Sequence, residues 1–70
     1  MTIFINDVAT EIPNTSYTLT DILKNKFNIP KDKKGIAIAV NENVIPKNEW
    51  DNFIIKENDR ILVIIAAQGG

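Results

Sequence analysis

The sequence predicts a small α+β domain in which a mixed β-sheet carries one helix on one of its faces. Stretches rich in β-branched residues lie near both ends of the chain, and a single amphipathic helical pattern lies between them. Because the chain has only 70 residues, it has room for one hydrophobic core. We therefore expect one domain over residues 1–65, followed by a flexible tail over residues 66–70.

The first elements are a hairpin and a helix. Residues 2–5 and 8–12 are β-prone segments joined by Asn6-Asp7, which predicts two strands and a two-residue turn. Thr18 followed three residues later by Asp21 has the spacing of a capping box, so the helix is expected to start there. Its apolar stripe comprises Leu19, Ile22, Leu23 and Phe27, and Pro30 predicts an end near Phe27 or Asn28.

The second half of the chain predicts three more strands. They cover residues 36–40, 44–45 and 60–65, and one helical turn within residues 47–53 is expected to place Trp50 and Phe53 on the core. The first and last strands are the most apolar, so we expect them side by side in the middle of the sheet. This order of elements predicts a β-grasp fold.

The composition excludes several classes of function. The sequence contains no cysteine and no histidine, which excludes Cys/His metal sites, thiol nucleophiles and imidazole-based catalytic triads. Eight basic and nine acidic residues give no basic excess for nucleic-acid binding. No apolar run approaches the ~18 residues needed to span a membrane. We therefore expect a cytoplasmic protein that cannot assemble a conventional active site and binds neither nucleic acid nor membrane.

The terminal pair Gly69-Gly70 is the first candidate functional feature. A frayed end or a cloning remnant would also give two terminal glycines. A glycine at the terminus has no side chain beside its carboxylate, so a narrow slot in a partner protein could admit it. The carboxylate is ionised at neutral pH and could attack a nucleotide phosphate. Five extended tail residues would reach about 17 Å into such a pocket.

The last predicted strand is the second candidate feature. Ile61, Val63 and Ile65 alternate with Leu62 and Ile64, so both faces of this strand are aliphatic. Three interpretations remain open: a strand buried on both faces, a face covered by an oligomer, or an exposed partner site. Phe4 is expected on the same face as Leu62 and Ile64, and these three residues are the candidate docking patch.

Two segments of the sequence carry a family resemblance. Residues 35–41 (GIAIAVN), with Val44-Ile45-Pro46 and Trp50, resemble the sulfur carrier proteins of thiamine biosynthesis, the ubiquitin-like ThiS family. Asp59-Arg60-Ile61 ahead of an apolar strand and Gln68-Gly69-Gly70 are similar to the same family.

The resemblance implies a protein co-substrate with no bound cofactor. In the family, a ThiF-like adenylating enzyme converts the terminal carboxylate, here that of Gly70, to an acyl adenylate. A cysteine desulfurase pathway then replaces AMP with sulfur, and a ThiG-like thiazole synthase takes the sulfur from the C-terminal thiocarboxylate. Gly69 would be the slim neck beside the activated residue. Because the chain has no cysteine to carry a persulfide, its carboxyl terminus is the expected attachment point.

Three alternatives to this function have the same fold. One is the small subunit of molybdopterin synthase, a sulfur carrier like MoaD, although the run from Val44 to Trp50 favours the thiamine pathway. A second is a modifier attached to lysines, although ubiquitin has arginines before its glycine pair and residues 66–68 have none. The third is a ubiquitin-like interaction domain whose terminal glycines have no chemical role.

Overall fold

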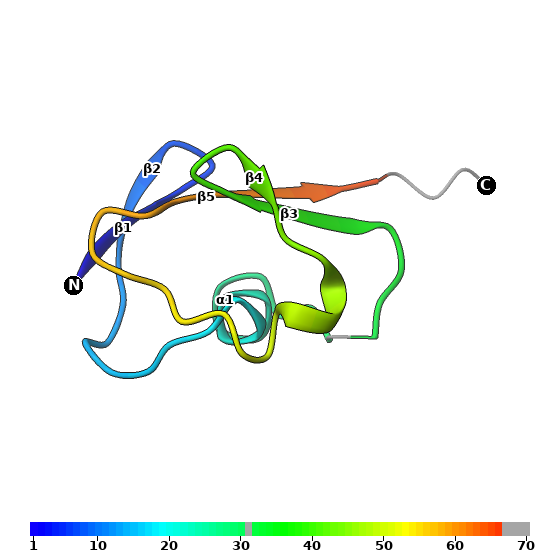
Figure 1. Cartoon of the computed structure of the whole chain (residues 1–70), viewed down its shortest axis with the longest axis horizontal. Helices are drawn as coiled ribbons and strands as arrows, with labels where there is room; N and C mark the ends of the chain where they lie inside the picture. The colour runs from blue at the N-terminus through cyan, green and yellow to red at the C-terminus, as the bar shows by residue number, and fades with distance from the viewer. Residues whose placement is uncertain (31, 67–70) are drawn as a thin grey trace.

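Five β-strands and one α-helix form two layers, a sheet and a helix lying across it (Figure 1). The structure is a computed structural model and describes residues 1–30 and 32–66. The elements are β1 (Thr2–Ile5), β2 (Val8–Glu11), α1 (Leu19–Lys26), β3 (Ile36–Val40), β4 (Asn43–Val44), a 3₁₀ turn (Lys47–Glu49) and β5 (Arg60–Ile65). β4 therefore lies one residue earlier than the predicted 44–45, although the amide of Ile45 still donates to the Ile38 carbonyl at 2.9 Å, so the pairing continues beyond the strand.

The strands are arranged in the order β2-β1-β5-β3-β4. β1 and β5 are parallel, with Phe4 opposite Arg60 and Ile5 opposite Ile61, whereas the other neighbouring strands are antiparallel. The predicted mixed sheet is confirmed, and so is the central placement of the first and last strands side by side.

The turn between β1 and β2 has the geometry that a tight hairpin requires. Asn6 and Asp7 both have positive φ angles, 49° and 68°, which is the type I′ pattern that matches the twist of the two strands. β2 ends at Glu11, one residue earlier than predicted. The amide of Ile12 nevertheless donates to the Met1 carbonyl at 2.9 Å, so the pairing continues beyond the strand.

Helix α1 begins at the predicted capping box. The Asp21 amide donates to the Thr18 hydroxyl at 3.2 Å, and the Thr18 amide donates to the Asp21 carboxylate at 2.9 Å. These two bonds satisfy amides that the first turn leaves without helical partners. The helix ends at Lys26, next to the predicted Phe27, and Asn28 reverses the chain with a φ of 55°.

The hydrophobic core lies between α1 and one face of the sheet. The helix contributes the fully buried Leu19, Ile22 and Leu23. Phe27 and Phe53 pack at the margin of the core and are only partly buried. Trp50 is buried as predicted, and its indole N–H donates to the Ile45 carbonyl at 2.8 Å. α1 and the segment carrying the 3₁₀ turn lie on the same side of the sheet (Figure 1), so the core has one side only.

Candidate functional site

The central strand β5 has one buried face and one open face. Ile61 and Val63 point into the core and are 2% and 6% exposed. Their neighbours Leu62 and Ile64 point away from the helix and are 47% and 52% exposed. No described element covers this second face (Figure 1). Of the three interpretations of this all-aliphatic strand, the described residues therefore exclude burial on both faces and leave two, a face covered by an oligomer and an exposed partner site.

An apolar patch extends from β5 over its neighbours on this open face. Strand register places Ala37 beside Ile64 and Ala39 beside Leu62, and Val44 lies beyond Ala39. The open-face patch consists of Phe4, Ala37, Ala39, Val44, Leu62 and Ile64. The structure thus brings together the three residues predicted for docking.

The members of the open-face patch differ in how much of each is accessible. Phe4 shares the face of Leu62 because its neighbours Ile3 and Ile5 point into the core, but it is half-buried rather than fully exposed. Val44 is 76% exposed and was missed from the sequence. Its location depends on the pairing of Ala39 with Val44, and a strand of two residues is too short to show alternation. Contiguous apolar surface of this kind is typical of a protein interface.

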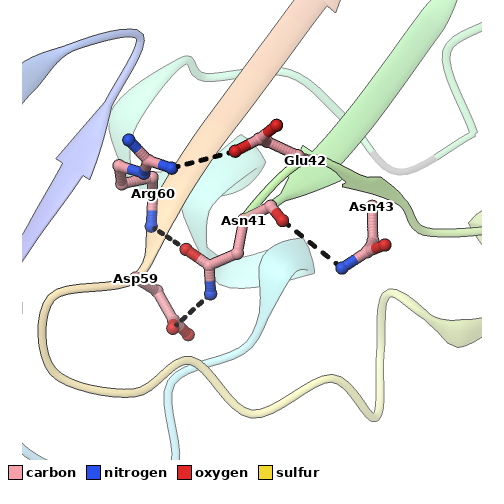
Figure 2. Close-up of polar contacts among 5 residues, drawn as sticks. All are labelled: Asn41, Glu42, Asn43, Asp59 and Arg60. Atoms are coloured by element: carbon pink, nitrogen blue, oxygen red, sulfur yellow. Dashed lines mark hydrogen bonds and ion pairs between the residues drawn. The ribbon is translucent and has the colours of Figure 1, made fainter.

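A polar network borders the patch at the end where β5 begins (Figure 2). Arg60 pairs with Glu42 at 3.2 Å, and its backbone amide donates to the Asn41 side chain at 3.0 Å. The Asn41 amide group in turn donates to Asp59 at 3.0 Å. Beside this network lies a shallow hollow of about 260 Å³, with Phe4, Leu62 and Arg60 among its lining residues. The patch therefore has a charged rim at this end.

The other end of β5 leads to the tail. Leu62 and Ile64 precede the strand's last residue, Ile65, and the amide of Ala66 still donates to the Gly35 carbonyl at 2.7 Å. Gly69 and Gly70 lie outside the described residues, so their roles stay predictions. Along the chain, two residues of the patch, Leu62 and Ile64, shortly precede residues 67–70, the segment that contains both glycines.

Other kinds of site are not apparent in the described chain. Residues 1–30 and 32–66 contain no group of His, Cys, Asp or Glu side chains arranged to hold a metal ion. Within the same residues, no helix has the length and apolar character needed to cross a membrane.

Comparison with known sequences identifies the family. A sequence model of the ThiS family matches residues 3–70. The chain belongs to the ThiS family. The resemblance carried by residues 35–50 and 59–70 is thereby confirmed. Among curated ThiS proteins, the sulfur carrier protein ThiS of Escherichia coli K12 is 27% identical over 70 residues, and the match covers 100% of both chains.

A solved ThiS structure has the same fold. The thiamine biosynthesis protein ThiS from Geobacter metallireducens superposes with a TM-score of 0.77 at 15% sequence identity, covering 100% of both chains. At this identity the likeness concerns the fold alone. It confirms the predicted β-grasp architecture, with one helix packed on a mixed five-stranded sheet.

Proposed function

We propose that this chain is a sulfur carrier of thiamine biosynthesis, whose terminal residue Gly70 is adenylated and then converted to a thiocarboxylate. The observation that carries the proposal is membership of the ThiS family over residues 3–70, a range that includes the terminal glycine pair. The relative from Escherichia coli is named as a sulfur carrier protein and matches along its whole length.

The proposed chemistry takes place at one carboxylate. An oxygen of the Gly70 carboxylate attacks the α-phosphorus of ATP, pyrophosphate leaves, and an acyl adenylate forms. A persulfide from a cysteine desulfurase pathway then attacks the carbonyl carbon and AMP leaves. A thiol reductant cleaves the acyl disulfide so formed, which leaves one sulfur on Gly70 as the thiocarboxylate. Gly69 keeps the approach to this carbon free of side-chain atoms. The thiocarboxylate finally donates its sulfur to thiazole formation.

In this proposal the chain is a co-substrate and its partners are the enzymes. A ThiF-like enzyme catalyses adenylation, and a ThiG-like thiazole synthase accepts the sulfur. The chain supplies a carboxylate that is already ionised at neutral pH, on a tail that enters the partner's active site. It has no cysteine, so sulfur cannot be held on a thiol of its own.

The open-face patch is the proposed docking surface for both enzymes. Phe4, Leu62 and Ile64 lie on the face without a helix, and the last two lie within four residues of the start of the tail. Docking there would direct residues 67–70 towards a nucleotide pocket. Burying exposed aliphatic side chains would favour the complex by removing their surface from water.

The experiment is to change the length of the tail. Deleting Gly70, or adding one residue after it, is expected to abolish ATP-dependent adenylation by the ThiF-like enzyme of the same organism. The melting temperature should stay that of the parent, because terminal residues contribute little burial. A truncated chain that is still adenylated would contradict the assignment of Gly70.

Intact-mass analysis of protein from the native host tests the sulfur step. Replacing one carboxylate oxygen with sulfur should add about 16 Da, located on the C-terminal residue. An isopeptide bond to a lysine of another protein would instead indicate a protein modifier. A permanent complex with a molybdopterin synthase large subunit would indicate the molybdenum-cofactor pathway.

A further inference from the structure

The two edges of β5 are bonded to different neighbours. Even-numbered residues pair with β3, as shown by the Asn41 amide bonding the Arg60 carbonyl at 2.8 Å and the Ala66 amide bonding Gly35 at 2.7 Å. Odd-numbered residues point the other way, towards β1, and the Asn6 amide bonds the Ile61 carbonyl at 2.8 Å. This alternation follows from antiparallel pairing with β3.

The side chain of Asn6 takes the next place along the β1 edge. Its carboxamide oxygen accepts from the Val63 amide at 2.8 Å, and its nitrogen donates to the Val63 carbonyl at 3.3 Å. The backbone has already turned into β2 at this point. One side chain therefore substitutes for a strand residue and satisfies both polar groups of Val63.

Ile65 is the next residue whose backbone groups point towards this edge. The backbone N–H and C=O of Ile65 have no partner among residues 1–30 and 32–66. β1 has ended before this point, and the pair that Ile65 forms with Ile36 in β3 is one of the pairs without hydrogen bonds between the two residues. Its side chain is 48% exposed, and that of the adjacent Ile64 is 52% exposed. An accessible strand edge with free backbone groups is a template for an added strand.

We propose that an extended segment of the adenylating enzyme adds to this edge of β5, in the space beyond Asn6 that β1 does not occupy. This inference rests on the proposed function. Along the chain, β5 is followed by the tail, so under the proposed function a protein that receives the tail docks next to this end of the strand. The edge also adjoins the open-face patch through Ile64, which makes strand addition and patch docking parts of one interface.

The free backbone groups of Ile65 indicate which groups the partner segment has to supply. One backbone C=O accepts from the Ile65 N–H, and a neighbouring N–H donates to the Ile65 carbonyl. The side chains of the partner segment that flank these backbone groups are expected to be small or apolar, because they would lie against Ile64 and Ile65. A second copy of this chain is a poorer occupant, because at this edge each copy has free backbone groups at only one described residue, Ile65.

Amide hydrogen exchange of the ¹⁵N-labelled protein tests the proposal. The Ile65 amide should exchange rapidly in the free protein and about tenfold or more slowly when the adenylating enzyme is saturating, the change that a hydrogen bond of ordinary strength produces. The Ile64 amide, which pairs with β3 in both states, is the internal reference.

A pair of proline variants provides an independent measurement. Ile65→Pro removes the free N–H without breaking a bond within the described chain, so it should weaken enzyme binding about tenfold. Ala9→Pro is the matched control: it removes an outward-facing amide from β2, at the far edge of the sheet, and should leave binding unchanged. If Ile65→Pro fails to fold, the exchange measurement on the parent chain decides.

The outcomes distinguish this inference from the proposed function. Adenylation within a stable complex, with unchanged exchange at Ile65, would overturn strand addition and leave the function standing. Absence of both complex and adenylation would overturn the proposed function and the inference together. Protection of Ile65 that rises with the concentration of this chain alone would show that a second copy occupies the edge, which also overturns the proposal.

Discussion

The two faces of β5 have different environments in this domain. Ile61 and Val63 are packed beneath α1, whereas Leu62 and Ile64, of nearly the same size and polarity, face outward. Side-chain chemistry does not distinguish the two sets. What separates them is the number of layers: one helix covers one face of the sheet, and no described element covers the other.

The difference indicates what each face contributes. Removing an aliphatic side chain from water on folding stabilises the native state in proportion to the area buried. Leu62 and Ile64 are about half exposed, so folding of the free chain buries only about half of their surface. The exposed half can still be buried when a partner binds. The buried face therefore determines stability, and the open face is proposed to determine binding.

The largest effect is expected from truncation on the buried face. Ile61→Ala should lower the free energy of unfolding by about 2–5 kcal/mol, the range for large-to-small changes in a core. The adjacent Leu62→Ala is the matched control and should lower it by only about 1 kcal/mol, because just over half of the Leu62 side chain is removed from water on folding. Urea denaturation measures both. Equal losses in the two variants would mean that the open face is structural.

The next effect concerns the open face and its partners. Leu62→Asp or Ile64→Asp should weaken binding to the adenylating enzyme and the thiazole synthase about thirtyfold, as truncated interface hot spots do. Val8→Asp, at an exposed apolar residue of β2 outside the patch, should bind like the parent. Calorimetry gives the affinities and thermal melting checks the fold. A folded Leu62→Asp protein with parental affinity would remove the patch from the interface.

The smallest effect concerns the contact between β5 and the first hairpin. Asn6→Gly keeps the positive φ but removes both hydrogen bonds to Val63, so unfolding should require about 1–2 kcal/mol less. Asn58→Gly is the control, because Asn58 has a φ of 68° and its side chain bonds no described residue. If thermal melting shows the same loss in both variants, the carboxamide bonds contribute nothing measurable.

Much of this architecture could be predicted from local sequence patterns. The capping box of Thr18 and Asp21 depends on residues three apart, and the alternation of Leu62 with Val63 follows from strand geometry. Both are confirmed because the information lies within one turn or one strand. Counting layers left the exposure of Leu62 and Ile64 open, because a single helix covers only one face but loops or an oligomer could cover the other; the structure shows that no described element does.

Features that depend on distant pairing could not be predicted in this way. The bonds of Asn6 to Val63 join residues 57 apart in sequence, and an asparagine in a turn usually indicates local turn chemistry. Val44 is placed by its register with Ala39. Phe27 is only partly buried and is the C-cap that follows the last residue of α1, a position that helical periodicity does not reveal.

The position of β5 also has a consequence for the order of folding. Among the described strands, β2 pairs only with β1, β4 pairs only with β3, and β5 alone joins the two pairs into one sheet. Two separate hairpins are therefore available before β5 docks, and docking must close a loop that spans most of the chain, which slows folding. The strand that completes the sheet is the same strand that displays Leu62 and Ile64 and leads to Gly70. A chain whose sheet is incomplete would lack the assembled open-face patch, so under the proposed function partner enzymes would bind only chains that have finished folding.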